Sequence, residues 1–165
     1  MKAIVAVDEG WGIGRDGAML FHIPPDLAYF RQMTMGHTVI MGRATFLALP
    51  NGPLPGRRNV ILSRSLHDVP GACVYPSLES LLADISQLEM ANAFVIGGQQ
   101  VYETMLDMCD TAYVTKILEE ATKTPDRFFP DISAMPVWHL ASSSEIHEHN
   151  NIRFRFDTYI KICGQ

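Results

Sequence analysis

The sequence predicts an α/β fold of three layers, αβα, in which a mainly parallel, twisted sheet of about eight strands lies between helices and has an antiparallel C-terminal edge. Short apolar runs alternate with helical patterns in the first two thirds of the chain, an order typical of a parallel sheet covered by helices. After Asp110 the runs lengthen and partly alternate with polar residues, which indicates antiparallel strands. Because 165 residues that are 47% hydrophobic suffice for one core, we expect a single domain over residues 1–165.

The expected strands of the first part are continuous apolar runs, which suit strands buried on both faces. These runs span Lys2–Val7, Thr38–Met41, Asn59–Leu62, Cys73–Tyr75 and Ala93–Ile96. Helical patterns span Pro25–Thr34, Ser77–Leu88 and Gln99–Met105. Two prolines suit the first turn of the first helix, and a serine is the expected N-cap of the second. The later strands span Thr111–Leu118, Trp138–Ser143 and Ile152–Ile162, with a polar turn at His149–Asn151.

Charge and cysteine content favour a small-molecule partner. The net charge is −5 without any run of like charges, which argues against nucleic acid or an anionic membrane surface. Cys73, Cys109 and Cys163 are odd in number and widely spaced, so we expect reduced thiols rather than disulfides or zinc ligands. No secretory signal or membrane-spanning stretch is evident, and we expect the protein in the cytoplasm.

Asp26 is the first candidate functional residue, because it opens a helix after two prolines and is flanked by Leu27, Tyr29 and Phe30. An aspartate in a first turn often interacts only with the helix dipole and water. Alternatively, a carboxylate among aromatic and aliphatic side chains is desolvated, which raises its pKa and lets it bind a cationic or amidine-like ring edge. Its two oxygens match two hydrogen bonds from such an edge. The residue types alone leave both interpretations open.

Three predicted strands end in residues that suit an anion. Gly97 and Gly98 follow a buried strand and precede a helix, which allows close approach of a phosphate, although a tight turn without a ligand has the same pattern. The second strand exit is Gly42-Arg43-Ala44-Thr45 and the third is Leu62-Ser63-Arg64. Arginine is a bidentate partner for phosphate. Because parallel sheets bind ligands at their carboxyl edge, we expect an anionic ligand there.

Two other motifs are weaker. Gly10-Trp-Gly-Ile-Gly14 follows a strand, but it lacks the glycine spacing and the immediate helix of a dinucleotide-binding fingerprint. We interpret this segment as a flexible loop that ends in the apolar tip Met19-Leu20-Phe21 and closes over a ligand. The His147-Glu148-His149 run lies beside a predicted hairpin turn without an evident third ligand, so we expect no metal.

Five blocks in this order give the chain a family resemblance. They are Ile-Pro-Pro-Asp26-Leu27, Val39-Ile-Met-Gly-Arg43-Ala-Thr45-Phe, Pro53-Leu-Pro-Gly-Arg57-Arg-Asn59, Val95-Ile-Gly-Gly98 and Phe129-Pro-Asp131. Together they resemble bacterial dihydrofolate reductase from the first strand to the last. The resemblance implies reduction of 7,8-dihydrofolate to 5,6,7,8-tetrahydrofolate, a step of one-carbon metabolism. A hydride would pass from nicotinamide C4 of NADPH to pterin C6, with protonation at N5.

The resemblance also implies a substrate site. Asp26 would hold pterin N3 and the 2-amino group, and Thr115 would hydrogen-bond this carboxylate. The N5 proton would arrive through water, while the carboxylate promotes ring protonation electrostatically. Arg57 would pair with the α-carboxylate of the substrate. The implied substrate-binding residues are Val5, Ala6, Asp26, Leu27, Phe30, Leu49, Leu54, Arg57, Ile96 and Thr115, and the implied catalytic set is Asp26, Thr115, Met19 and Phe21.

The resemblance implies an NADPH site in the same way, with a cis peptide between Gly97 and Gly98 and the following helix facing the pyrophosphate. Two cationic side chains, Arg43 and Arg64, near a 2′-phosphate would favour NADPH over NADH. The implied cofactor-binding residues are Ala6, Ile13, Gly14, Met19, Gly42, Arg43, Ala44, Thr45, Leu62, Ser63, Arg64, Ile96, Gly97, Gly98, Gln99, Gln100, Val101 and Tyr102. The loop through Met19 would exclude water from the nicotinamide.

Some residues depart from the family pattern. Phe21 stands where tryptophan is common, Leu20 where proline is common, and Gln100 where arginine is common. Changes around Phe21, Leu27 and Phe30 bear on sensitivity to antifolates such as trimethoprim. The resemblance further implies a monomer. Two alternatives stay open: a reductase of the same fold that acts on a ribosylated pyrimidine, as in riboflavin biosynthesis, and a folate- or nucleotide-binding protein without turnover.

Overall fold

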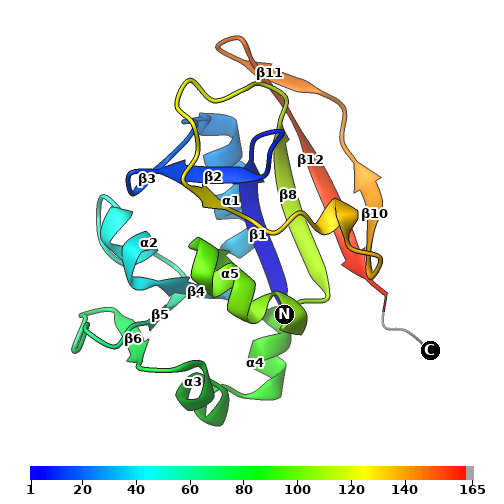
Figure 1. Cartoon of the computed structure of the whole chain (residues 1–165). Coiled ribbons are helices and arrows are strands. Elements are labelled where there is room, and N and C mark those ends of the chain that lie inside the picture. Colours follow the sequence, from blue (N-terminus) through cyan, green and yellow to red (C-terminus); the bar gives the residue numbers. More distant parts are fainter. Residues whose placement is uncertain (163–165) are drawn as a thin grey trace.

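A nine-stranded sheet crosses the molecule in the computed structural model, which describes residues 1–162 (Figure 1). Its strands are β1 (Lys2–Val7), β4 (Thr38–Gly42), β5 (Arg58–Leu62), β6 (Ala72–Tyr75), β7 (Phe94–Gly97), β8 (Thr111–Ile117), β10 (Trp138–Ser143), β11 (His147–His149) and β12 (Ile152–Lys161). The order is β10-β12-β8-β1-β7-β4-β5-β6, with β11 also paired to β12. From β8 to β6 all pairs are parallel, whereas β10, β11 and β8 each pair antiparallel with β12. The predicted parallel sheet with an antiparallel C-terminal edge is confirmed.

Helices cover both faces of this sheet, as the three-layer prediction requires (Figure 1). Helices α1 (Pro24–Thr34) and α2 (Arg43–Ala48) pack against the core cluster that contains Ile4, while α3 (Leu78–Asp84), α4 (Gln87–Asn92) and α5 (Gln99–Met105) pack against the cluster that contains Ala3 and Val5. The side chains of neighbouring β1 residues therefore pack on opposite faces of the sheet. Burial on both sides explains why the central strands are continuous apolar runs.

The single helix predicted over Ser77–Leu88 is wrong, because the chain forms two helices with a break between them. Ser77 is the N-cap of α3, as predicted, and accepts a hydrogen bond from Ser80 N. Ile85 then leaves the helix with ψ 130° and is buried in the core. Ser86 starts α4 by accepting a hydrogen bond from Glu89 N. A second N-cap and the burial of one isoleucine stabilise a bend that helical periodicity does not reveal.

The segment expected to be a flexible loop after β1 instead forms part of a second, three-stranded sheet, here called the lid sheet. It consists of β2 (Gly12–Arg15), β3 (Ala18–Met19) and β9 (Arg127–Phe128). The β2–β3 turn has φ 52° at Asp16 and 78° at Gly17. Such values belong to a type I′ turn, which matches the twist of an antiparallel hairpin. In Figure 1 the lid sheet lies across the upper end of the main sheet.

Two short 3₁₀ turns complete the described elements, η1 (Leu106–Met108) and η2 (Ile132–Ala134). The predicted hairpin turn near the C-terminus is confirmed, with positive φ at Asn150 and Asn151. Cys73 is exposed and Cys109 buried, both as free thiols, while Cys163 lies outside the described residues. Within residues 1–162 no helix is long and apolar enough to cross a membrane.

Candidate active site

The predicted ligand-binding strand exits meet at the carboxyl edge of the parallel strands, where β4 and β7 are neighbours. A Cβ added at Gly42 would lie only 3.0 Å from Val101 Cγ2 of α5, and one added at Gly98 would lie 3.3 Å from Thr45 Oγ1 of α2. The turns that open α2 and α5 are therefore packed against each other without space for larger side chains. The Gly97-Gly98 peptide is cis, as the resemblance implies. Val101 is buried beside Gly42.

The third exit lies next to the first, because Leu62 is the register partner of Gly42. The hydroxyl of Ser63 accepts hydrogen bonds from the amides of Ser65 (3.2 Å) and Leu66 (3.0 Å) and so shapes its own turn. A depression of about 590 Å³ adjoins Ser63 and runs toward Pro76; it lies at the β5–β6 end of the sheet, away from the predicted pterin site at α1, β1 and β8. Ser63 is the single predicted site residue among its lining residues.

Two cations stand at this edge without an anionic partner. Arg43 and Arg64 are both exposed, and neither forms an ion pair with any residue in the described part of the chain. Ala44 and Gln100 are exposed near them. Tyr102, by contrast, is buried and donates a hydrogen bond of 2.7 Å to Ile4 O, so its hydroxyl serves the core. The edge is thus open, basic and close-packed at its glycines.

Asp26 lies in the first turn of α1, which starts at two prolines and has no side-chain N-cap. Its Oδ1 accepts a hydrogen bond of 2.6 Å from the hydroxyl of Thr115, a buried residue of β8 that is the register partner of Ala6. No residue of 1–162 hydrogen-bonds Oδ2 of this carboxylate. Burial raises the pKa of Asp26 above its ordinary value, and the Thr115 hydrogen bond opposes that rise. A helix-dipole interaction requires neither a hydrogen-bond partner 89 residues away nor a desolvated carboxylate, so these two features favour the interpretation of Asp26 as a pocket carboxylate.

Several apolar residues predicted to bind the substrate belong to one hydrophobic cluster. Phe30, Leu49, Leu54 and Ile96 are partly buried and pack against one core cluster. Leu27 remains 37% exposed, and Val5 is buried in the sheet. Figure 1 shows α1 behind β1. Val5 and Ala6 belong to β1, and Thr115 of the neighbouring β8 is the register partner of Ala6. The structure thus brings the sequence-predicted substrate residues of α1, β1 and β8 together.

Arg57 is fixed next to Phe30, one of these apolar residues. Its Nη1 donates to Thr34 Oγ1 (3.1 Å), its Nε donates to Pro55 O (3.0 Å), and its guanidinium carbon lies 6.0 Å from the ring centre of Phe30. Burial, and to a smaller extent repulsion from Arg31, lowers the pKa of Arg57. Since arginine ordinarily titrates above about 12, the side chain stays cationic near neutral pH.

Asn59 is a site residue whose role the sequence reasoning missed. It is buried in β5 and makes three hydrogen bonds to the preceding loop: its Oδ1 accepts from Leu54 N (2.8 Å), and its Nδ2 donates to Leu54 O (2.9 Å) and Arg57 O (3.0 Å). These bonds fix the backbone of Leu54 and Arg57, the two predicted substrate-binding residues of this loop. A polar side chain in an otherwise apolar strand was the signal available in the sequence.

Residues of the lid sheet and of the segment that follows β3 lie in different environments. Ile13 packs against the main core, whereas Met19 is 63% exposed beside a depression of about 170 Å³ that Leu20 also lines. Phe21 is half-buried in a small cluster with Ile117. The expected tip Met19-Leu20-Phe21 is therefore not one exposed apolar surface, because Phe21 points into the protein while Met19 remains free. The ring of His147 packs on Phe154 and Phe156, and no cluster of three metal-ligating side chains occurs within residues 1–162.

Fold and geometry define an α/β protein with two candidate ligand sites, one built on a desolvated carboxylate and the other on glycines and on arginines that form no ion pair within residues 1–162. The sequence model of the family described as dihydrofolate reductase matches residues 1–161. The chain therefore belongs to the dihydrofolate reductase family, and the resemblance inferred from its sequence blocks is confirmed.

Individual relatives support this assignment. Dihydrofolate reductase of Bacillus subtilis is 37% identical over 161 residues, which cover 96% of this chain and 92% of the relative. The enzyme of Staphylococcus aureus is 38% identical over 159 residues, 94% of each chain. The match to dihydrofolate reductase of Mycobacterium leprae is 46% identical and covers 64% of each chain. Among solved structures, dihydrofolate reductase from Enterococcus faecalis complexed with NADP(H) and RAB-propyl superimposes with a TM-score of 0.83 at 32% identity, covering 97% of this chain and 95% of that one.

Proposed function

We propose that this chain is an NADPH-dependent dihydrofolate reductase. It reduces 7,8-dihydrofolate to 5,6,7,8-tetrahydrofolate: pterin C6 gains a hydride from nicotinamide C4, N5 gains a proton, and NADP⁺ is released. The observation that carries the proposal is the pair of Asp26 and Thr115, because a desolvated carboxylate with one oxygen bonded and the other available suits the amidine-like edge of a pterin.

The substrate-side residues then have distinct roles. Asp26 binds pterin N3 and the 2-amino group and increases the proton affinity of N5 through its negative charge, while water carries the proton. Thr115 orients the carboxylate by its 2.6 Å hydrogen bond. Arg57 pairs with the α-carboxylate of the substrate, and Phe30, Leu49 and Leu54 hold the apolar part between them. The same pocket would take antifolate inhibitors.

The cofactor-side residues fit a phosphorylated dinucleotide. NADPH, when bound, supplies the hydride. Arg43 and Arg64 are exposed cations without an ionic partner among residues 1–162, which suits a 2′-phosphate. Gly97 and Gly98 let the backbone approach the pyrophosphate, and Thr45 lies beside them. The E. faecalis relative in complex with NADP(H) supports the choice of cofactor. We further propose that the chain acts as one domain and a monomer in the cytoplasm.

A rate assay with purified protein tests the proposed activity. Absorbance of the reduced nicotinamide is followed with dihydrofolate or with a ribosylated pyrimidine as substrate, and with NADPH or NADH as cofactor. We expect rapid loss with NADPH and dihydrofolate and slow loss with NADH. Replacing Arg43 and Arg64 by alanine should reduce the preference for NADPH while leaving NADH turnover nearly unchanged. Turnover of the pyrimidine alone, or binding of both ligands without oxidation, would contradict the proposal.

A further inference from the structure

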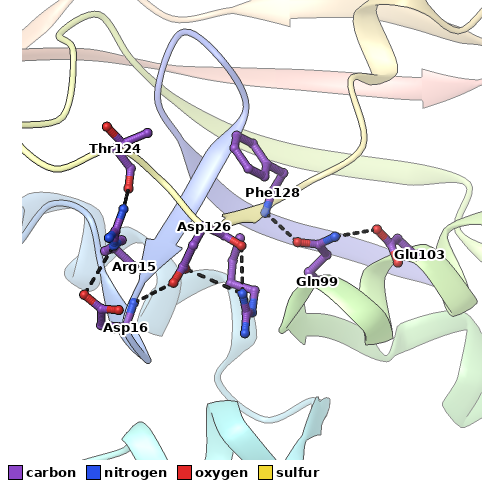
Figure 2. A network of polar contacts seen from close by, with 8 residues as sticks. Arg15, Asp16, Gln99, Glu103, Thr124, Asp126 and Phe128 are labelled. Atoms are coloured by element: carbon purple, nitrogen blue, oxygen red, sulfur yellow. Dashed lines mark hydrogen bonds and ion pairs between the residues drawn. The ribbon is translucent and has the colours of Figure 1, made fainter.

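Gln99, the first residue of α5, connects the cofactor-side turn to the lid sheet (Figure 2). Its Oε1 accepts a hydrogen bond of 2.9 Å from Phe128 N in β9, and its Nε2 donates one of 2.8 Å to Glu103 Oε1, one helical turn further along. Because a backbone N–H only donates and a carboxylate only accepts, both partners require the same amide orientation. The Gln99 side chain is thus fixed at both ends, on a residue that directly follows the Gly97-Gly98 peptide.

The strand that Gln99 contacts organises the lid sheet. Phe128 is the register partner of Gly12, and the neighbouring Asp126 N donates a hydrogen bond of 3.0 Å to Gly14 O. Further out, Asp126 Oδ2 accepts from Asp16 N at 3.1 Å, as Figure 2 shows. Displacement of β9 would therefore displace β2 and the hairpin turn with it.

The residue after β9 is anchored in the main core by its side chain. Phe129 N donates to Trp11 O at 2.9 Å, and the buried Phe129 ring stacks on Trp11 and packs edge-on against Tyr102 of α5, with 4.8 Å between the ring centres. Phe128 itself is held differently. The Phe128 side chain is 42% exposed. Among residues 1–162, the bond from Phe128 to Gln99 is the one hydrogen bond that joins a lid strand to a helix.

We infer that Gln99 is a positioning residue that couples the order of the lid sheet to binding at the Gly97-Gly98 turn. The inference rests on the proposed function, since it assigns the cofactor to that turn. A ligand that orders the start of α5 also fixes the Gln99 backbone and, through the side chain, β9; by linkage, an ordered lid favours that ligand equally. The chain thereby holds the lid over the reacting rings when the cofactor is in place. A hydrogen bond of ordinary strength gives a coupling of roughly three- to tenfold.

Gln99→Met tests the inference, because methionine has a similar length but offers Phe128 only a weak acceptor. We expect faster hydrogen exchange at the Phe128 amide in the ligand-free protein, NADPH affinity weakened about three- to tenfold, and unchanged dihydrofolate affinity. The double variant Gln99→Glu with Glu103→Gln reverses the side-chain pair, and it should restore slow exchange at the Phe128 amide because a carboxylate can accept from Phe128 N. Thr104→Ala is the matched control on α5 and should behave as wild type, since within the described residues the Thr104 hydroxyl bonds only Gln100 O.

Two results would overturn the coupling: wild-type exchange at Phe128 in Gln99→Met, or wild-type NADPH affinity in that variant despite faster exchange. The exchange measurement needs neither cofactor nor turnover, so it judges the contact even if the proposed reductase activity fails. Unaltered exchange with normal reductase activity would reject the positioning role alone. Absence of activity in the wild-type protein, with altered exchange in Gln99→Met, would instead reject the proposed function.

Discussion

Replacing Asp26 by asparagine removes the charge of the proposed pterin site but keeps its shape. Thr115 can still donate its hydrogen bond to the amide oxygen, so the side chain should stay in place. Oδ2, which no described residue binds, becomes an amide nitrogen that cannot accept hydrogen bonds from the ring edge. A hydrogen bond to a charged group contributes about 1.5–3 kcal/mol, which corresponds to a loss in kcat/KM of roughly 10- to 100-fold from the lost bond. Loss of the electrostatic effect on N5 adds to this, so we expect roughly 100- to 1000-fold near neutral pH.

The pH profile distinguishes this explanation from a general defect. The loss in Asp26→Asn should be largest at high pH, where little substrate is already protonated and the carboxylate matters most. Steady-state and single-turnover rates across the pH range measure it, with NADPH affinity and circular dichroism as checks of the fold. Asp107→Asn makes the same chemical change at a fully exposed carboxylate and should leave all values unchanged. Wild-type rates from Asp26→Asn over the whole range would refute the assignment of the site.

Three further predictions concern the same site. Thr115→Val removes the hydrogen bond that lowers the pKa of Asp26, so the carboxyl titration followed by ¹³C NMR should move to higher pH and dihydrofolate affinity should fall about tenfold; an unmoved titration would exclude this role. Burial raises the folded-state pKa of Asp26, so its contribution to stability is complete at low pH and is lost as pH rises through that pKa. The ligand-free Asp26→Asn variant should therefore have a higher Tm than wild type at pH 8, by a margin that shrinks toward pH 4. A margin that does not change with pH would count against desolvation of Asp26. Asn59→Ala leaves Leu54 N without its buried partner, so it should cost about 1–3 kcal/mol in urea unfolding and raise the KM for dihydrofolate while NADPH affinity holds; equal losses for both ligands would contradict a local effect on Leu54 and Arg57.

The main sheet could be predicted from the sequence because its central strands are buried on both faces and so appear as continuous apolar runs. Lys2–Val7 and Gln99–Met105 have the predicted bounds, and the C-terminal strands lie at the antiparallel edge. The bend at Ile85 and Ser86 was not accessible, since both segments continue the same apolar period and the bend is stabilised by packing against distant strands.

The lid sheet was missed for a related reason. Its strands are too short for a clear alternation, and β2 pairs with β9, more than a hundred residues later in the chain. The Asp16-Gly17 pair was a usable hairpin signal that the sequence reasoning did not exploit.

The candidate site was only partly predictable from residue types. Spacing identified Asp26 as a helix-opening carboxylate and the strand exits as anion sites, but its contact with Thr115 joins positions 89 residues apart and was expected from family resemblance alone. The side-chain roles of Asn59 and Gln99 depend on backbone groups of other segments, which only a folded structure specifies.

Isotope transfer tests the central claim most directly. Purified protein is mixed with dihydrofolate and NADPH that carries two deuterium atoms at nicotinamide C4, and the tetrahydrofolate formed is analysed by mass spectrometry and NMR. Hydride transfer from nicotinamide C4 predicts one deuterium per product molecule, located at C6, and none at N5 after exchange with solvent. Product without deuterium at C6, or no product from folded protein that binds both ligands, would contradict hydride transfer at this site.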